Sequence, residues 1–330
     1  MNRTRRQRLH LVQISTSGGV PVTLAVRRLL RGHRLRKDNH MLPQVDLFGD
    51  VVEKDELLRD KYIEPPFTRL DAVGGNWQKR KNIWRSRGIK SELGRDGELS
   101  LAQSLNKFDP RESYTGTSIF DPVLCELMYR WFCPVAGSIL DPFAGGSVRG
   151  IVAHYLGYYY TGIDLSQRQI EANRDNALDV LQVNNQPNWY VGDSSDVLDG
   201  LDKQYDFIFS CPPYMDLEVY SDNPQDLSTM SDNQFISVYQ SIIKKTCQKL
   251  VSGGFACFVV GDVRDKKTGY YKDFITITKQ AFYGAGMFLY NEGILLENGL
   301  NTAAMRADKT FTASKKLIKV HQNVLVFIKP

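Results

Sequence analysis

Four consecutive residues near the middle of the chain, Cys211, Pro212, Pro213 and Tyr214, have types and an order that suit a chemical site. They follow the β-forming run YDFIFS, and two adjacent prolines cannot lie inside a central strand or a helix, because proline has a fixed φ and no N–H to donate. The sequence therefore predicts a rigid tip at the end of a strand. Such a tip, with a thiol on one side and an aromatic ring on the other, would keep reacting atoms aligned.

A second group of residues, DPFAGGS, begins at Asp141. Gly145 and Gly146 lack Cβ atoms, which suits backbone that approaches a ligand closely at the start of a helix. Asp164 closes the next strand pattern 23 residues after Asp141 and is placed to hydrogen-bond ribose hydroxyls, and Asp193 closes a third and is placed to accept from an adenine amino group. Aspartates at such positions also cap helices and form turns. The residues therefore leave a nucleoside-containing cofactor and a structural role open.

Both groups need a scaffold, and the pattern from about residue 115 onward predicts one. Short β-forming runs alternate with amphipathic helices, which is typical of an α/β domain with a mostly parallel sheet and helices on both faces. We expect seven strands, at 138–141, 159–164, 189–193, 206–210, 255–262, 287–296 and 323–328. Because open α/β sheets bind ligands beyond the carboxyl ends of their strands, we expect the tip and the glycine turn to meet at one edge.

Local signals also predict where helices begin and end. Asp121 followed by Pro122 is an N-cap with proline at the first helical position. Ser166 and Ser231 each precede a glutamine by three residues, which is the spacing of a capping box. We expect the helix that starts after Ser231 to end at the glycine pair 253–254.

The N-terminal part of the chain is basic. Residues 1–37 carry ten Arg and Lys residues and no acid, whereas the whole chain has a net charge of +5. Such an arm either binds nucleic acid by neutralising phosphates or is a solvated extension. We expect residues 1–59 to be a flexible basic arm and linker, 60–114 an accessory segment that contacts nucleic acid, and 115–330 the main domain.

The accessory segment interleaves Trp77 and Trp84 with cations. Aromatic rings among cations can stack on bases and hold phosphates, but buried tryptophans with a basic rim give the same pattern. The candidate nucleic-acid contacts are Trp77, Lys79, Arg80, Lys81, Arg85 and Arg87.

In combination, the tip and the turn resemble the S-adenosylmethionine-dependent amino-methyltransferases of DNA. In that family a D/N/S-P-P-Y/F tip follows the fourth strand and an F-x-G-x-G turn follows the first; here CPPY stands at 211–214 and FAGGS at 143–147. The phrases DLEVYSDNPQDLS and VVGDVRDKKTG look like a subgroup carried by phages and mobile elements. The resemblance covers about residues 60 to 330. It implies a Rossmann-like seven-stranded sheet of the class I methyltransferase type, S-adenosylmethionine as cofactor, and methyl transfer to adenine N6 or cytosine N4 in double-stranded DNA.

The resemblance also implies roles for individual residues. An exocyclic amino nitrogen is a poor nucleophile because its lone pair is delocalised, and acceptors aimed at its hydrogens favour the geometry in which it can attack. By position, the acceptors are the Cys211 side chain and the Pro212 carbonyl, while Pro213 stiffens the tip and Tyr214 stacks on a base flipped out of the duplex. The implied cofactor contacts are Thr117, Phe120, Asp141, Pro142, Phe143, Gly145, Gly146, Ser147, Asp164, Leu165, Asp193 and Ser194.

Cysteine at the first position of the tip departs from the family pattern, since a thiol is a weak acceptor. Either Pro212 provides most of the polarisation, or Ser210 or Asp216 assists. Three alternatives stay open: attack of a Cys211 thiolate on ring carbon C6 to activate C5 of a pyrimidine, methylation of an RNA base, and a nucleic-acid-binding relative without turnover.

Composition excludes several other classes of protein. The chain has 330 residues, 42% hydrophobic and 24% charged, and contains no apolar run of about 18 residues, so we expect neither a membrane-spanning helix nor a membrane partner. Five cysteines without a C-x-x-C pair and five unclustered histidines argue against a disulfide framework and against a metal site. We expect a cytoplasmic protein of a bacterial cell or phage-infected host. Target recognition would come from residues before about 115, from loops 214–230 and 297–318, or from a protein partner.

Overall fold

The computed structural model describes residues 10–14, 22–26, 58–90, 120–182, 186–215, 223–265, 267–297 and 303–330. The chain divides into two compact units, Met1–Asp55 and Glu56–Pro330. In the first unit, β1 (His10–Ile14) and β2 (Val22–Val26) form an antiparallel pair, which the sequence analysis did not predict. The second unit begins near α1 (Leu58–Tyr62), so the predicted boundary after residue 59 falls within this helix.

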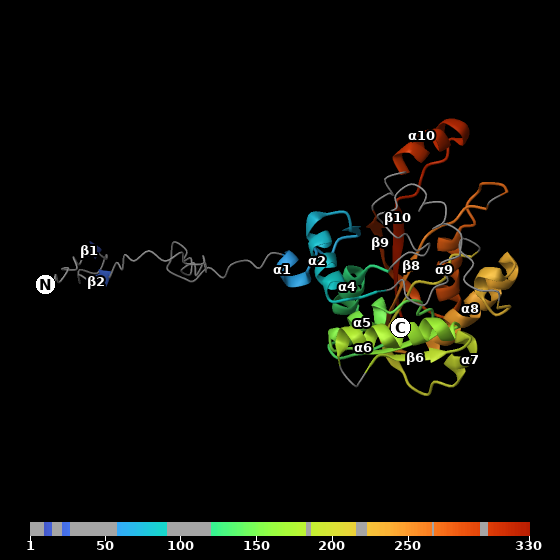
Figure 1. The fold of residues 1–330 in the computed structure, drawn as a ribbon, viewed down its shortest axis with the longest axis horizontal. Helices are drawn as coiled ribbons and strands as arrows, with labels where there is room; N and C mark the ends of the chain where they lie inside the picture. Colours follow the sequence, from blue (N-terminus) through green and yellow to red (C-terminus); the bar gives the residue numbers. More distant parts are fainter. Residues whose placement is uncertain are drawn as a thin grey trace. The chain divides into compact units, whose positions relative to one another are not determined.

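The second unit is built on an eight-stranded sheet with the order β3-β9-β10-β8-β7-β4-β5-β6 (Figure 1). Every neighbouring pair is parallel except the two pairs made by β10, which runs antiparallel to β8 and β9. In chain order the strands are β3 (Arg69–Asp71), β4 (Ser138–Asp141), β5 (Tyr159–Asp164), β6 (Asn188–Val191), β7 (Tyr205–Ser210), β8 (Leu250–Val260), β9 (Phe288–Leu296) and β10 (His321–Ile328).

The seven expected strands are present, but the expected total of seven is wrong because β3 adds an eighth. This strand has three residues and pairs in parallel with β9 at the edge of the sheet. A run of three residues is too short for a strand period to be recognised. The segment that the sequence analysis treated as accessory therefore contributes to the main sheet.

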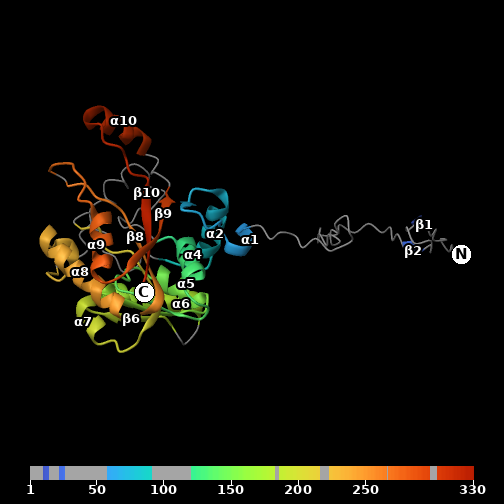
Figure 2. The ribbon, with the colours of Figure 1, turned by 180° about the vertical axis from the view of Figure 1, so that it is seen from behind.

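Helices cover both faces of the sheet (Figures 1 and 2). Alternate residues of one strand belong to separate buried clusters: Phe207 and Phe209 pack with α2, α4, α5 and α6, whereas Ile208 packs with α7, α8 and α9. The helices are α2 (Gly75–Ser86), α4 (Pro122–Phe132), α5 (Val148–Tyr155), α6 (Gln167–Leu181), α7 (Ser194–Asp199), α8 (Asp232–Gln248), α9 (Phe274–Gly284) and α10 (Ala303–Ser314), with a 3₁₀ turn η1 (Leu227–Thr229).

The predicted helix starts are confirmed. The Asp121 carboxylate accepts hydrogen bonds from the N–H groups of Val123 and Leu124, and Pro122 occupies the first position of α4. The Ser166 hydroxyl accepts from the backbone N–H of Gln169 at the start of α6. At Ser231 the reciprocal capping box with Gln234 is formed, and α8 begins at the next residue.

The predicted end of α8 is wrong. The helix ends at Gln248, and Gly253 and Gly254 lie inside β8, where the pairing of β8 with β7 shifts register. Gly253 has φ +75°, and its N–H donates to the Lys329 carbonyl, so the glycine serves an irregular stretch of strand. A glycine pair that ends a helix and one that allows a bulge look alike in sequence.

The topology brings the candidate residues to one edge of the sheet. Because β10 is the only antiparallel member of the eight-stranded sheet, the carboxyl ends of the other strands share an edge with the amino end of β10. From β4 the chain continues to β5 on one side, and from β6 it returns to β7 on the other side of β4. The direction of winding therefore changes between β4 and β7, which is where open α/β sheets bind ligands.

Candidate active site

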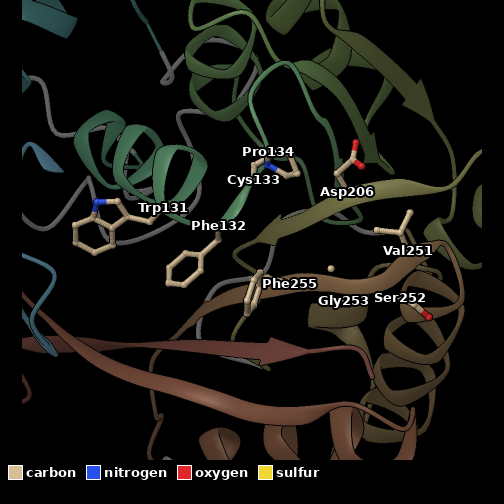
Figure 3. A pocket seen from close by; sticks show the side chains of 10 residues that line it. Trp131, Phe132, Cys133, Pro134, Asp206, Val251, Ser252, Gly253 and Phe255 are labelled. Atoms are coloured by element: carbon tan, nitrogen blue, oxygen red, sulfur yellow. The ribbon is translucent and has the colours of Figure 1, made fainter. Parts of the chain in front are cut away.

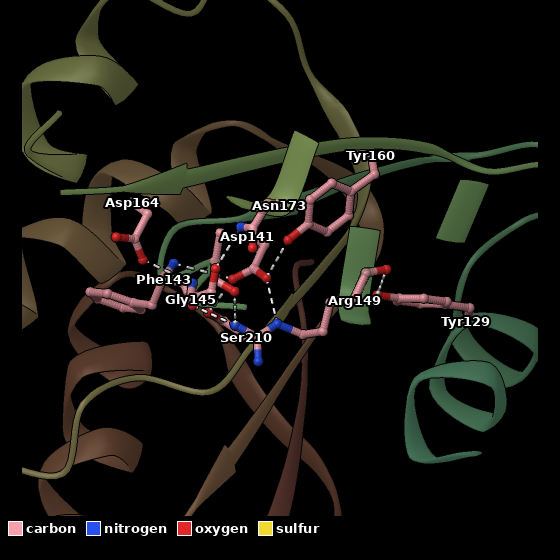
Figure 4. A network of polar contacts seen from close by, with 10 residues as sticks. Tyr129, Asp141, Phe143, Gly145, Arg149, Tyr160, Asp164, Asn173 and Ser210 are labelled. Carbon is pink, nitrogen blue, oxygen red and sulfur yellow. Dashed lines mark hydrogen bonds and ion pairs between the residues drawn. The ribbon is translucent and has the colours of Figure 1, made fainter. Parts of the chain in front are cut away.

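A hydrogen bond joins the ends of β4 and β7. The Ser210 hydroxyl, one residue before the tip, donates to Asp141 Oδ1 at 2.6 Å. The Asp141 side chain is 0% exposed, and its other oxygen accepts from Tyr160 Oη at 2.7 Å and from Arg149 Nε at 2.5 Å (Figure 4). The structure thus places Asp141 below the candidate cofactor turn, as the centre of a buried polar network.

Arg149 is the cation of this network, and the sequence analysis missed it. Its guanidinium lies 4.7 Å from the centre of the Phe120 ring and donates to the carbonyls of Phe143, at 2.5 Å, and Ala144, at 2.8 Å. Burial alone would lower the pKa of Arg149, but the charge of Asp141 raises it, so the ion pair persists. The available signal was an arginine near the start of the mostly apolar helix sequence VRGIVAHY.

The glycine turn is held from β5 and α6. Gly145 has φ +50°, which favours glycine, and its N–H donates to Asp164 Oδ2 at 2.9 Å. Its carbonyl accepts from Asn173 Nδ2 at 2.7 Å (Figure 4). The other Asp164 oxygen accepts from the N–H of Ser166 at 2.9 Å. The carboxylate of Asp164, a half-buried residue, therefore fixes the turn from the end of β5.

Asp193 caps a helix, which is the structural alternative that the sequence left open for it. It is the N-cap of α7, and its carboxylate accepts from the Ser195 N–H at 2.7 Å. The neighbouring Ser194 is buried and donates to the Pro142 carbonyl at 2.5 Å, which ties the start of α7 to the glycine turn.

The predicted cofactor contacts thus divide into two sets. Thr117 lies outside the described residues, and four others, Asp141, Pro142, Ser147 and Ser194, are buried. The half-buried members are Phe120, Phe143, Gly145, Gly146, Asp164, Leu165 and Asp193.

The tip follows β7 as predicted, and the side chains of Cys211 and Tyr214 contact each other. Cys211 Sγ lies 3.4 Å from the hydroxyl oxygen of Tyr214. That hydroxyl is also within reach of the Val259 carbonyl, at 3.3 Å, and of Gln322 Oε1, at 3.1 Å. The Tyr214 ring packs against Phe274, with the ring centres 5.9 Å apart.

Burial raises the pKa of the Cys211 thiol. The nearby charge of Arg149 lowers it by less, so the thiol form is favoured. Of the two assisting residues considered from the sequence, Ser210 is fully buried and donates to Asp141, and Asp216 lies outside the described residues.

The helix α2 is anchored to α4 by its aromatic and basic side chains. Trp77 and Trp84 are 1% and 4% exposed, and Trp84 Nε1 donates to Glu126 at 3.0 Å. Arg80 makes two hydrogen bonds to the same buried carboxylate, at 2.6 and 2.5 Å. Trp77 Nε1 donates to Asp121, the N-cap of α4.

The structure therefore selects the buried-tryptophan alternative, and base stacking by Trp77 and Trp84 is wrong because both rings belong to the core. Lys81 pairs with Asp121 at 2.8 Å. The exposed cations of the predicted set are Lys79, Arg85 and Arg87, and Arg87 stacks on the Tyr155 ring at 4.3 Å.

A surface hollow of about 400 Å³ lies at the opposite edge of the sheet (Figure 3). It is lined by Cys133 and Pro134 after α4, by Asp206 near the start of β7, and by residues 251–255 near the start of β8. The amino ends of these strands point away from the tip, so the hollow is separate from the candidate active site.

Within the described residues, no helix combines the length and apolar character needed to cross a bilayer, and no group of three or more His, Cys, Asp or Glu side chains is arranged to hold a metal ion.

No family model matches the chain, and no curated protein matches it. Among solved structures it resembles TrmN from Thermus thermophilus, with a TM-score of 0.44 and 16% identity over 70% of this chain and 53% of that protein, so it spans about half the length of TrmN. A putative RNA methyltransferase from Pyrococcus horikoshii has a TM-score of 0.43 and 13% identity, over 76% of this chain and 98% of that one. Magnesium protoporphyrin IX methyltransferase from Synechocystis PCC 6803, solved with S-adenosylmethionine bound, has a TM-score of 0.40 and 13% identity, over 76% and 97%.

Proposed function

We propose that this protein transfers a methyl group from S-adenosylmethionine to the exocyclic amino group of adenine (N6) or cytosine (N4) in DNA. The observation that carries the proposal is the hydrogen bond between Ser210 and Asp141. It fastens the proline tip beside the glycine turn at the point where the winding of the sheet changes direction. A cofactor on the turn and a base on the tip would then be neighbours.

The residues around the turn fit the cofactor. When bound, S-adenosylmethionine supplies an electrophilic methyl group on a sulfonium sulfur. Gly145 and Gly146 lack the Cβ atoms that would keep a ligand from the backbone, and both are half-buried at the edge of the sheet. We assign Asp164 to the ribose hydroxyls, since a carboxylate is a strong acceptor for them. Phe120, Phe143 and Leu165 would supply the apolar contacts.

The tip would orient the substrate amino group. The Pro212 carbonyl and the Cys211 sulfur accept its two hydrogens, which makes the nitrogen pyramidal and directs its lone pair at the methyl group. Pro212 and Pro213 keep both acceptors in place. Because the pKa of Cys211 is raised by burial, little thiolate is present near neutral pH, which disfavours the alternative of C5 chemistry.

The decisive test is mass spectrometry of nucleosides after incubation with isotope-labelled S-adenosylmethionine, with duplex DNA and transfer RNA as parallel substrates. We expect label on N6 of deoxyadenosine or N4 of deoxycytidine. Label on ribonucleosides alone would show that the substrate is RNA and not DNA. Label on C5 of a pyrimidine would contradict the assigned chemistry. Binding of S-adenosylmethionine without label in either substrate would leave the inactive nucleic-acid-binding alternative.

A cysteine variant separates amino-group from ring-carbon chemistry. If Cys211 acts only as an acceptor, Cys211→Ser should stay active, because a hydroxyl is the stronger acceptor. Cys211→Ala should retain partial activity through the Pro212 carbonyl. A Cys211→Ser protein that folds and binds cofactor but has no activity, or a covalent adduct with DNA containing 5-fluorocytosine, would support a thiolate nucleophile instead.

A further inference from the structure

A hydrogen-bonded chain runs from the tip across the sheet edge to Glu297, which the proposed chemistry does not use. Glu297 follows β9, and its Oε1 accepts from Gln322 Nε2 at 2.8 Å. Gln322 lies near the start of β10, and its Oε1 is 3.1 Å from the hydroxyl of Tyr214. The Tyr214 hydroxyl in turn lies 3.4 Å from Cys211 Sγ. Two strands on the far side of β8 are thereby linked to the tip.

The chemical types of these groups determine which one donates and which one accepts at each step of the hydrogen-bonded chain. An ionised carboxylate only accepts, so Gln322 must point its NH₂ at Glu297 and its oxygen at Tyr214. The Tyr214 hydroxyl therefore faces two oxygens that only accept, that of Gln322 and the Val259 carbonyl, and its single hydrogen goes to one of them. Because a hydroxyl hydrogen bonds more strongly to an oxygen than to a thiol sulfur, we assign the Cys211 thiol as the donor in its contact with the Tyr214 oxygen.

We propose that Glu297 is a positioning residue that, through Gln322 and Tyr214, turns the Cys211 S–H hydrogen away from the substrate and leaves the sulfur lone pairs to accept from the amino group. This inference rests on the proposed function and explains how a thiol can stand where the related enzymes have an oxygen acceptor. Without Glu297, the Gln322 amide can reverse, its NH₂ can donate to the Tyr214 oxygen, and the thiol hydrogen is released to point at the substrate.

The charged state of Glu297 matters because only the carboxylate prevents the reversed amide. Burial raises the pKa of Glu297, while the hydrogen bond from Gln322 and the charge of Lys81 lower it by less and the charge of Asp121 raises it further. These groups face it from β10, α2 and the N-cap of α4, and the Cys211 thiol faces it from the tip. A group with a raised pKa loses its negative charge as the pH falls through that value. As the pH is lowered, activity should therefore begin to fall at a higher pH than it would if Glu297 had the pKa of an ordinary glutamate.

Infrared spectroscopy of the protein without substrate tests the direction of the chain independently of activity. The difference spectrum between wild type and Cys211→Ala isolates the S–H stretching band of this thiol. We expect a hydrogen-bonded band that moves to the position of a free thiol in Tyr214→Phe and weakens in Glu297→Gln. Glu292→Gln is the control, because Glu292 lies on β9 and contacts Lys279 and Asn323 but not Gln322, and it should leave the band unchanged. A band at the same position in wild type and Tyr214→Phe would overturn the proposal, whether or not the protein methylates DNA.

Kinetics on the methylated substrate provide the second readout. We expect Glu297→Gln and Gln322→Leu to lower kcat about tenfold, the equivalent of one hydrogen bond, with cofactor affinity unchanged by calorimetry. When kcat is measured as a function of pH, it should fall on the acid side in wild type and in Glu292→Gln. This fall should be absent in Glu297→Gln. Full activity with an unaltered fall on the acid side in Glu297→Gln would contradict the proposal, and cofactor binding by each variant shows that the comparison is made on folded protein.

Discussion

Replacing Arg149 by methionine would test whether the buried network holds the candidate site together. Arg149 is 4% exposed and Asp141 is 0% exposed. Methionine has an unbranched apolar side chain, so it fills much of the arginine stem's space while removing the ion pair and the bonds to the carbonyls of Phe143 and Ala144. Asp141 would keep the hydroxyls of Tyr160 and Ser210 but lose its counter-charge.

The expected loss follows from that uncompensated charge. Breaking a buried ion pair from one side costs about 3–5 kcal/mol of unfolding free energy. The double variant Asp141→Asn with Arg149→Met leaves no charge unpaired. Its loss of unfolding free energy should therefore be smaller, by about 1–3 kcal/mol, than the sum of the losses in the two single variants. Urea denaturation followed by tryptophan fluorescence measures all four proteins, and Trp84 and Trp77 report on the same side of the sheet.

Arg130→Met is the matched control. The Arg130 side chain is 49% exposed and pairs with Glu126, which keeps its bonds to Arg80 in the variant. We expect this change to cost no more than about 1 kcal/mol, as for an exposed ion pair. A loss below about 1 kcal/mol for Arg149→Met, or additive losses in the double variant, would refute the conclusion that the Arg149–Asp141 pair organises the turn.

Three further predictions concern the cofactor, the core and the tip. Asp164→Ala should weaken binding of S-adenosylmethionine by about 1.5–3 kcal/mol, as for a charged hydrogen-bond partner that also secures Gly145, and unchanged affinity by calorimetry would remove Asp164 from the site. Trp84→Ala should cost about 3–5 kcal/mol of stability because the ring is in the core, whereas Lys79→Ala, on the exposed side of the same helix, should stay within about 0.5 kcal/mol; similar urea midpoints for the two would contradict the burial argument. Since burial raises the pKa of Cys211, its alkylation by iodoacetamide should remain slow up to about pH 8.5, and a rate equal to that of free cysteine by mass spectrometry would show an accessible thiolate.

The elements that the sequence predicted correctly are those with local signals. The caps at Asp121, Ser166 and Ser231 rest on residues three or fewer positions apart, and each strand pattern is a short contiguous run. The tip and the glycine turn came together because parallel strands share their carboxyl edge, which is a rule of topology. The short strand β3 was missed because three residues carry too little pattern.

The roles of side chains were less predictable, since they depend on partners far apart in the chain. Asp141 looked like a cofactor contact, and only the positions of Arg149, Tyr160 and Ser210, on three different elements, show why its carboxylate is buried. The tryptophans of α2 carried a usable signal: a spacing of seven residues places them on one face of a helix, which favours a core role. The surrounding cations hid it, because arginine and lysine also pair with the carboxylates of a neighbouring helix.

The tip is held from both of its ends by different halves of the sheet. On the side of the glycine turn, Ser210 is fixed by the Asp141 network of β4, β5 and α5. On the other side, Tyr214 is fixed by Gln322 of β10 and the Val259 carbonyl of β8. Because the two sets of contacts share no residue, losing one should leave the other in place. Arg149→Met would then lower the unfolding free energy while the contact between Tyr214 and Gln322 stays in place, and Glu297→Gln would alter the S–H band of Cys211 with little change in unfolding free energy.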